Sequence, residues 1–190
     1  MFLKTPSLLI VALAAALMMG ACQAQAPSPP PPGPAYRPTS TLKDLMAYVV
    51  DPTADTLWAT VSIVNDAKGT VAKAPKTDEE WAAVRGYAIQ LIEASNLLQI
   101  PGRAMARPGE KPHYPGIELE FDEIGRLIES DRAAWNTLAH GLHDKSTALL
   151  KPIDAHDAEG FRDASETLYD ACENCHKRYW FPPKSPPASK

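Results

Sequence analysis

The stretch 157–179, DAEGFRDASETLYDACENCHKRY, decides how the rest of the chain is interpreted. Its apolar residues return at three- and four-residue steps, so it predicts an amphipathic helix that starts near Asp157. Phe181-Pro182-Pro183 ends this helix, because proline cannot continue one. One face of the helix carries Phe161, Ala164, Leu168, Cys172, Cys175 and Tyr179. Two cysteines are therefore expected near the C-terminal end of a helix that packs against others.

Within this helix, Cys172-Glu173-Asn174-Cys175-His176 forms the pattern C-x-x-C-H, which attaches a c-type haem. Two thiols at this spacing on one helical turn can form thioethers to the two vinyl groups of the porphyrin, and the adjacent imidazole can coordinate the iron from one side. We therefore expect one covalent haem c, with Cys172 and Cys175 as attachment points and His176 as an axial ligand.

Two other interpretations of the cysteine pair are weaker. A thioredoxin-like pair follows a strand at a helix N-terminus, where the macrodipole lowers a thiol pKa, but this pair is at the far end of its helix. A structural zinc site needs four ligands, and the chain has only one other cysteine, Cys22, close to the apolar N-terminal run.

The first of three earlier helices is expected from Thr41 onward. Asp51-Pro52 interrupts it, so we expect a kink there, or a restart with Asp51 as the cap, while the apolar side keeps its phase across the break. At 100° per residue one side carries Leu42, Leu45, Met46, Val49, Val50, Leu57, Val61 and Val64, with Met46 near its middle.

The second and third helices complete an all-α pattern. Thr77-Asp78-Glu79-Glu80 is a capping box that begins a helix ending before Pro101-Gly102, and a long connection rich in Pro and Gly follows. The third helix is expected from about Glu118 to Leu150, where Lys151-Pro152 ends it. No stretch shows the sustained alternation of a strand. Four such helices predict an antiparallel up-down-up-down four-helix bundle, with covalent haem at the C-terminal end of the last helix.

The N-terminal region is predicted to be an export signal. Lys4 precedes an uncharged apolar run of about 14 residues, the size of a signal-peptide core and short for a membrane span. Met19-Gly20-Ala21-Cys22 is similar to a bacterial lipobox, in which Cys22 is lipidated and becomes the first mature residue. Ala24-Gln25-Ala26 offers an ordinary cleavage site that would discard Cys22. We favour the lipoprotein signal.

The predicted domains are a signal peptide at 1–21, a Pro-rich linker at 22–40, the helical bundle at 41–183 and a disordered tail at 184–190. The linker is expected to be an extended stalk, since its prolines favour a polyproline conformation. The chain has 19 basic and 23 acidic residues, a net charge of −4, and no basic tract, so nucleic acid is not an expected partner. We expect a periplasmic protein that a lipid on Cys22 anchors to a bacterial membrane.

A four-helix pattern closed by Cys172-x-x-Cys175-His176-x-x-Tyr179 resembles the class II c-type cytochromes, which are the cytochrome c-prime group and its low-spin relatives. The resemblance covers roughly 41–180 as an arrangement of helices, but only the last twenty residues of that range are specific. It implies haem bound covalently by both cysteines, with His176 as the proximal ligand. The chain departs from the family in its kinked first helix, its long middle connection and the tail Trp180-Phe181-Pro182-Pro183.

The ligand opposite His176 is predicted from topology. In an up-down-up-down bundle, the start of the first helix, the second-to-third connection and the end of the last helix share one end. At 1.5 Å per residue, Met46 lies about 8 Å from its helix start and His176 about 6 Å from its helix end, so they sit at similar depth. Met46 is the expected sixth ligand. Alternatively it packs as core, where related five-coordinate cytochromes place an apolar side chain.

The other candidate ligands are less well placed. His140 and His143 are predicted about 30 Å from the haem end, on the surface. His156 joins the last two helices at the far end, as a solvated loop residue. His113 and Met105 lie in the middle connection, where ordering a ligand costs more entropy than on a helix. Three basic residues of that connection are expected either to pair with the haem propionates or to be solvated, namely Arg103, Arg107 and Lys111.

The expected function is single-electron transfer, because a His/Met pair stabilises reduced iron and raises its potential. The alternative is a five-coordinate haem that binds nitric oxide or carbon monoxide, with Met46 as packing. Either would be a carrier or a gas-binding protein, not an enzyme. A peroxidase would need an acid-base residue beside the iron, and the first helix has no His or Arg. Redox partner proteins are the expected partners, and a homodimer is a further expectation because family members often pair.

Overall fold

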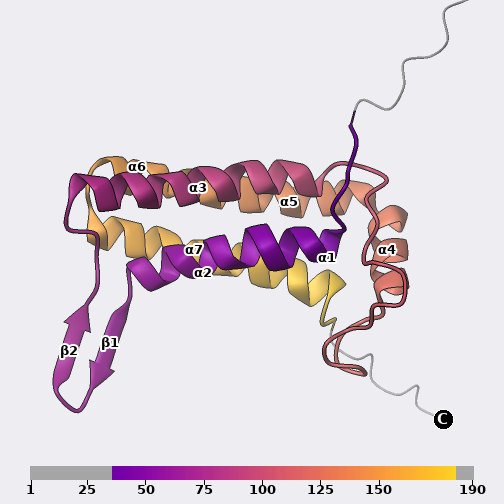
Figure 1. Ribbon diagram of the computed structural model, residues 1–190, viewed down its shortest axis with the longest axis horizontal. Helices are drawn as coiled ribbons and strands as arrows, with labels where there is room; N and C mark the ends of the chain where they lie inside the picture. Colours follow the sequence, from indigo (N-terminus) through magenta and orange to yellow (C-terminus); the bar gives the residue numbers. More distant parts are fainter. Residues whose placement is uncertain (1–35, 183–190) are drawn as a thin grey trace, which may run out of the picture. The chain divides into compact units, whose positions relative to one another are not determined.

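The computed structural model describes residues 36–182, which are mostly helical. Four long helical stretches lie side by side (Figure 1): α1, η1 and α2 in succession (Leu42–Leu45, Met46–Val50 and Asp51–Thr60), α3 (Asp78–Leu98), α5 (Arg132–Ala148) and α7 (Ala158–Tyr179). Among them α2 packs against α3, α3 against α5, α5 against α7, and α7 against α2. The predicted helical class is confirmed, and one small hairpin is added to it.

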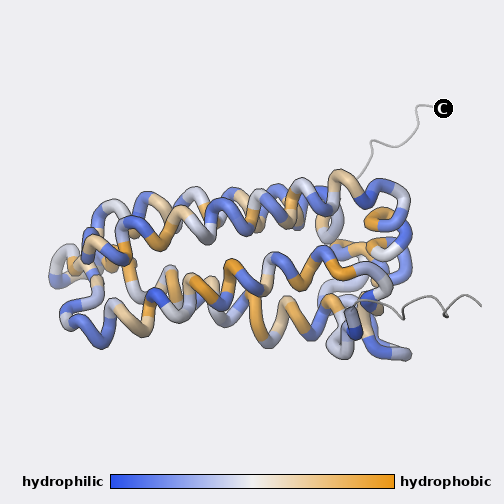
Figure 2. Tube along the Cα trace, turned by 90° about the horizontal axis from the view of Figure 1, so that it is seen from above, coloured by the Kyte–Doolittle hydropathy of each residue, from blue (hydrophilic) through white to orange (hydrophobic). Residues whose placement is uncertain are grey.

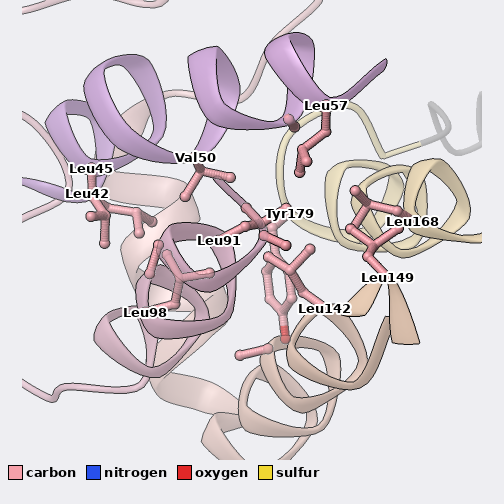
Figure 3. Close-up of a cluster of buried hydrophobic side chains, with 14 of the residues drawn as sticks. Leu42, Leu45, Val50, Leu57, Leu91, Leu98, Leu142, Leu149, Leu168 and Tyr179 are labelled. Carbon is pink, nitrogen blue, oxygen red and sulfur yellow. The ribbon is translucent and has the colours of Figure 1, made fainter. Parts of the chain in front are cut away.

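The core runs along the inside of these helices. Hydrophobic and hydrophilic positions alternate along each of them (Figure 2), as an amphipathic pattern requires. Figure 3 shows side chains from α2, α3, α5 and α7 converging, and the largest that are fully buried include Phe161, Leu57, Leu91, Leu149 and Leu168. Because burying a Leu or Phe side chain contributes about 1.5–3 kcal/mol, this shared interior is the main source of stability.

Side-chain caps fix where the helices begin. The predicted capping box at Thr77 is confirmed: its hydroxyl accepts from the Glu80 amide at 3.2 Å, and the Glu80 carboxylate accepts from the Thr77 amide. Thr41 and Asp44 form a second capping box at the start of α1. The last helix begins near Asp157 as predicted, and the Asp157 carboxylate caps it by accepting from the Gly160 amide at 3.0 Å.

The first helix passes through Asp51-Pro52 without a restart. η1 is a π-helical turn in which the Asp51 amide donates to the Met46 carbonyl, and Pro52 follows in the first turn of α2. The expectation that Asp51 caps a new helix is wrong, because α2 has no side-chain cap. Pro52, which has no amide to donate, directly follows the π turn, where the regular α-helical hydrogen-bond pattern is already interrupted.

The π turn also explains how the apolar side keeps facing the core. Two rows of buried or half-buried residues recur every fourth position: Leu42, Met46, Val50, Ala54, Trp58 and Leu45, Val49, Thr53, Leu57, Val61. An α-helix turns about 100° per residue, so four residues overshoot one turn by about 40° and four such steps drift by about 160°. The π turn takes up one extra residue, about 100° of that drift. The apolar side therefore stays in phase only because the helix is not uniformly α.

The first helical stretch ends earlier than the sequence predicts. α2 ends at Thr60, and Val64, predicted to be on the helix, lies in β1 (Ile63–Asp66), which pairs antiparallel with β2 (Gly69–Ala72). The hairpin projects from the end of α2 (Figure 1). Gly69 has a φ of 127°, a conformation that suits glycine where the second strand starts.

The third predicted helix is in fact three. α4 (Phe121–Ser130) ends at Asp131, whose backbone is not helical. Its side chain then caps α5, with the carboxylate accepting from the Ala134 amide at 3.0 Å. Leu127, an apolar residue of α4, is 37% exposed. Pro152 does not end the helix as predicted but lies in the first turn of α6 (Leu150–Asp154), where a proline is tolerated.

Several predictions lie outside the described residues. They are the signal peptide at 1–21, the lipobox with Cys22, the larger part of the Pro-rich linker and the tail at 184–190. Within 36–182, none of the helices has the length and apolar character needed to cross a bilayer.

Candidate functional site

The C-terminal end of α7 is held among segments that are distant in sequence. The His176 carbonyl accepts from the amides of Trp180 and Phe181 at 2.7 and 2.8 Å, so the chain turns back there. The Trp180 carbonyl in turn accepts from the Leu119 amide at 3.1 Å, in the connection that follows α3. That connection also meets the first helix, because the Leu42 amide donates to the Ala104 carbonyl at 2.8 Å. The start of the first helix, the connection after α3 and the end of α7, which are predicted to share one end of the bundle, therefore do meet.

Cys172, Cys175 and His176 lie together near this end of α7. Both cysteines are free thiols, and all three side chains are half-buried. Cys172 and Cys175 pack against the hydrophobic core and are three residues apart, so their thiols lie on one side of the helix. The predicted arrangement of the motif on one helical turn is therefore present.

Burial sets the protonation of these groups. Burial, with a smaller effect of the Asp51 charge, raises the pKa of Cys172 to about 11, and burial raises the pKa of Cys175 to about 12. Burial lowers the pKa of His176 below its ordinary value, against the opposing charges of Glu173 and Asp51. At neutral pH the site therefore presents two protonated thiols and a neutral imidazole, the form of histidine that coordinates a metal.

These properties bear on the two weaker interpretations of the cysteine pair. An exchange-active pair has a lowered thiol pKa, and both thiol pKa values here are raised. In the part of the chain that the structure describes, no three His, Cys, Asp or Glu side chains cluster as they would to hold a metal ion. The donor set of two thiols and one imidazole fits a covalently attached porphyrin, which itself supplies four of the ligands of its iron.

No family model, curated protein or solved structure matches this chain.

Met46, the predicted sixth ligand, belongs to a different helical stretch from the motif. It is half-buried, packs against the core and opens η1. Asp51 directly follows η1, and its charge acts on both Cys172 and His176. Sequence reasoning missed Asp51 as a neighbour of the motif, because only the packing of α2 against α7 brings these residues together.

The other candidate ligands are placed as follows. α5 begins near the end of α7, as the Asp131–Arg178 ion pair of 2.9 Å requires, so His140 lies about 12 Å along α5 and not about 30 Å as predicted. His140 is exposed, and so is His113. His156 is not a purely solvated residue, since its ring stacks on Trp81 with centroids 5.1 Å apart.

Met105 and the basic residues of the connection have partners within the protein. Met105 is half-buried against Gly125, where an added Cβ would come within 3.1 Å of its Cγ. Arg103 donates to the Ser40 and Leu97 carbonyls, at 2.8 and 3.2 Å. Two ion pairs complete the set, Arg107–Asp44 at 2.6 Å and Lys111–Glu120 at 3.7 Å. Their pairing with haem propionates stays a prediction.

The aromatic residues near the motif are structural. Tyr179 is 4% exposed, with its ring 5.2 Å from that of Trp135. The Trp135 indole donates to the Leu98 carbonyl at 2.9 Å and so joins α5 to α3. Phe181 meets His176 edge-on, with centroids 6.4 Å apart, and thus covers part of the imidazole.

Proposed function

We propose that this chain is an exported mono-haem c-type cytochrome that transfers single electrons, similar in architecture to the class II c-type cytochromes. Haem c is attached through Cys172 and Cys175, and its iron is bound by His176, with Met46 as the sixth ligand. One observation carries the proposal: two free thiols and an imidazole, all half-buried, lie together near the end of one helix.

The arrangement of the helices supports an antiparallel four-helix bundle around this site. α2, α3, α5 and α7 contact one another in a closed ring, and the start of α1 meets the connection that holds the end of α7. Bundles of this kind place cofactors between side chains of facing helices. Bound there, haem supplies one-electron redox chemistry, while this chain supplies axial ligands, partial exclusion of water and nearby carboxylates.

Electron transfer is favoured over gas binding by the position of Met46. It is half-buried on the first helical stretch, and Asp51, five residues further, is close enough to His176 for its charge to act there. Thioether ligation favours reduced iron and keeps the sixth position closed to small gases. We further propose that the protein works in the periplasm, on a lipid anchor at Cys22, and exchanges electrons with redox partner proteins.

The test is an absorption spectrum of the reduced protein, purified from a host that matures c-type cytochromes, with and without carbon monoxide. The proposal predicts a low-spin spectrum that carbon monoxide does not change, and in the oxidised protein a methionine-sulfur charge-transfer band. Met46→Ala should lose that band and bind carbon monoxide.

Met105→Ala is the matched control, since Met105 is also half-buried and lies at the same end of the molecule. It should keep both the band and the closed sixth position. A high-spin reduced spectrum and rapid carbon monoxide binding by the wild type would replace electron transfer with the gas-binding alternative. A band that survives in Met46→Ala would remove Met46 from the site.

A further inference from the structure

A groove of about 340 Å³ lies between the end of α2, the start of β1 and the outer side of α7. Its apolar lining comes from Trp58, Val61, Ile63 and Tyr169. Arg162 and Glu166 supply the charged groups. Small-molecule sites are typically concave, mostly apolar or aromatic and equipped with a few polar groups, and the volume of this groove falls in their range.

Two aromatic rings shape the groove. The Trp58 indole is fixed, because it donates to the Ser165 carbonyl at 3.1 Å. Tyr169 meets it edge-on, with centroids 6.1 Å apart and an angle of 63° between the rings, yet Tyr169 remains 53% exposed. A ring that is held by one neighbour and open on its other side offers a stacking surface to a flat molecule.

Arg162 supplies an unused positive charge. It is half-buried, and among residues 36–182 its guanidinium has no hydrogen-bond or ion-pair partner. Two other arginines of the bundle do have one, Arg85 with Asp154 at 2.8 Å and Arg178 with Asp131 at 2.9 Å. A guanidinium is suited to a planar carboxylate or sulfonate, which it can bind through two hydrogen bonds.

We propose that this groove binds a planar aromatic anion, with its ring against Tyr169 and Trp58 and its charged group on Arg162. Glu166 lies one helical turn after Arg162 and is exposed at the groove. Its carboxylate repels a second negative charge, so the site selects monoanions over dianions.

The groove is close to the haem-attachment motif. Tyr169 is three residues before Cys172 on α7, about 5 Å along the helix axis. A redox-active member of the ligand class would therefore exchange electrons with the haem at short range. That consequence rests on the proposed function, whereas binding itself does not.

The experiment measures binding of two probes to the purified holoprotein by calorimetry: 2-naphthoate, which is a planar aromatic monoanion, and 2-naphthalenemethanol, its neutral counterpart. Wild type should bind the anion saturably and more tightly. Arg162→Gln should weaken the affinity for 2-naphthoate about tenfold and change the affinity for the neutral probe by no more than about twofold. Tyr169→Leu should weaken the affinity for both probes roughly three- to tenfold. Glu166→Gln should raise the affinity for 2-naphthoate, because it removes a negative charge beside the bound anion.

Arg126→Gln is the matched control, because Arg126 is an exposed arginine on α4, away from the groove. It should change neither affinity. The proposal is overturned if 2-naphthoate does not saturate, if Arg162→Gln weakens both probes equally, or if Arg126→Gln has the same effect as Arg162→Gln. Because these readouts need no electron transfer, they can succeed or fail independently of the proposed function.

Discussion

Deleting one residue from the π turn should be tolerated, whereas the same deletion in a regular helix should not. Ala47 lies in η1 and is exposed. Its removal lets the first helix run as a continuous α-helix. The residues before the deletion rotate by about 100° relative to those after it, which replaces the phase correction that the π turn now provides. Leu42 and Leu45 therefore still face the core.

The loss of stability caused by deleting Ala47 follows from the displacement of α1. The start of α1 moves by about 1.5 Å along the axis. This strains the backbone hydrogen bonds from Leu42 to Ala104 and from Lys43 to Met105, of 2.8 and 3.0 Å. At about 1 kcal/mol each, their loss lowers the free energy of unfolding by at most about 2 kcal/mol.

Deletion of Gln90 is the matched comparison. Gln90 is also exposed, but it lies in the middle of α3, which is regular. Its removal turns one half of α3 by about 100°, so that either Trp81, Val84 and Ala88 or Leu91, Ile92 and Leu98 leave the core. At about 1.5–3 kcal/mol per large side chain, the loss is about 5 kcal/mol or more, comparable with the whole stability of a domain.

Urea unfolding followed by far-ultraviolet circular dichroism measures both variants. We expect a cooperative transition at a modestly lower midpoint when Ala47 is deleted, and no folded baseline when Gln90 is deleted. Equal losses in the two variants would refute the reasoning, because the π turn would then not be a one-residue phase correction.

Three further predictions concern single side chains. Thr77→Ala removes the hydroxyl that caps α3 and should lower the free energy of unfolding by about 1 kcal/mol in urea titrations, while Thr137→Ala, an exposed mid-helix threonine, should cost less. Trp135→Phe leaves the buried Leu98 carbonyl without its 2.9 Å donor and should cost about 2 kcal/mol, seen as a lower melting temperature; an unchanged value would show that this bond does not hold α5 to α3. The pKa of Asp44 is lowered by its hydrogen bonds to the Thr41 amide and hydroxyl and by Arg107, so its ionised form stabilises the fold above about pH 4 and this contribution is lost as the pH falls further. Asp44→Asn should therefore reduce the difference in urea midpoint between pH 6 and pH 3, and an unchanged difference would contradict this.

Local signals in the sequence were sufficient to predict where α3 and α7 begin. Thr77 with Glu80, and Asp157 with Gly160, place side-chain acceptors against the first free amides, an interaction that needs no distant partner. Asp131 carries the same signal. The sequence nevertheless predicts one continuous helix there, because apolar residues keep a helical spacing on both sides of Asp131, whereas in the structure α4 ends and α5 begins at this residue.

The hairpin and the π turn were harder to predict because each depends on a global constraint. In segment 63–72, the β-branched pairs Ile63-Val64 and Thr70-Val71 flank a turn that contains Gly69, which is a hairpin signal. The apolar residues Val61 and Val64, however, also match a helical period. The four-residue spacing from Leu42 to Val61 was visible in the sequence. Reading it as a π turn requires knowing that both halves of the helix pack against the same neighbours.

Some features of the candidate site could also be predicted from the sequence, whereas others depend on the fold. Cys172, Cys175 and His176 are adjacent in sequence, so their arrangement on one helical turn could be predicted without a fold. Asp51 acts on them through space, across the contact between α2 and α7, and no spacing in the sequence records this. The groove at Trp58 and Tyr169 likewise joins residues more than a hundred positions apart.

Intact-protein mass spectrometry tests the central claim most directly, because a thioether-bound porphyrin stays on the chain through denaturation. The protein, produced in a host that matures c-type cytochromes, should carry the mass of one haem beyond that of its mature polypeptide. Replacing both Cys172 and Cys175 by Ala should remove that mass. A wild-type protein with the bare polypeptide mass, or one that releases its haem into acidified acetone, would contradict the account.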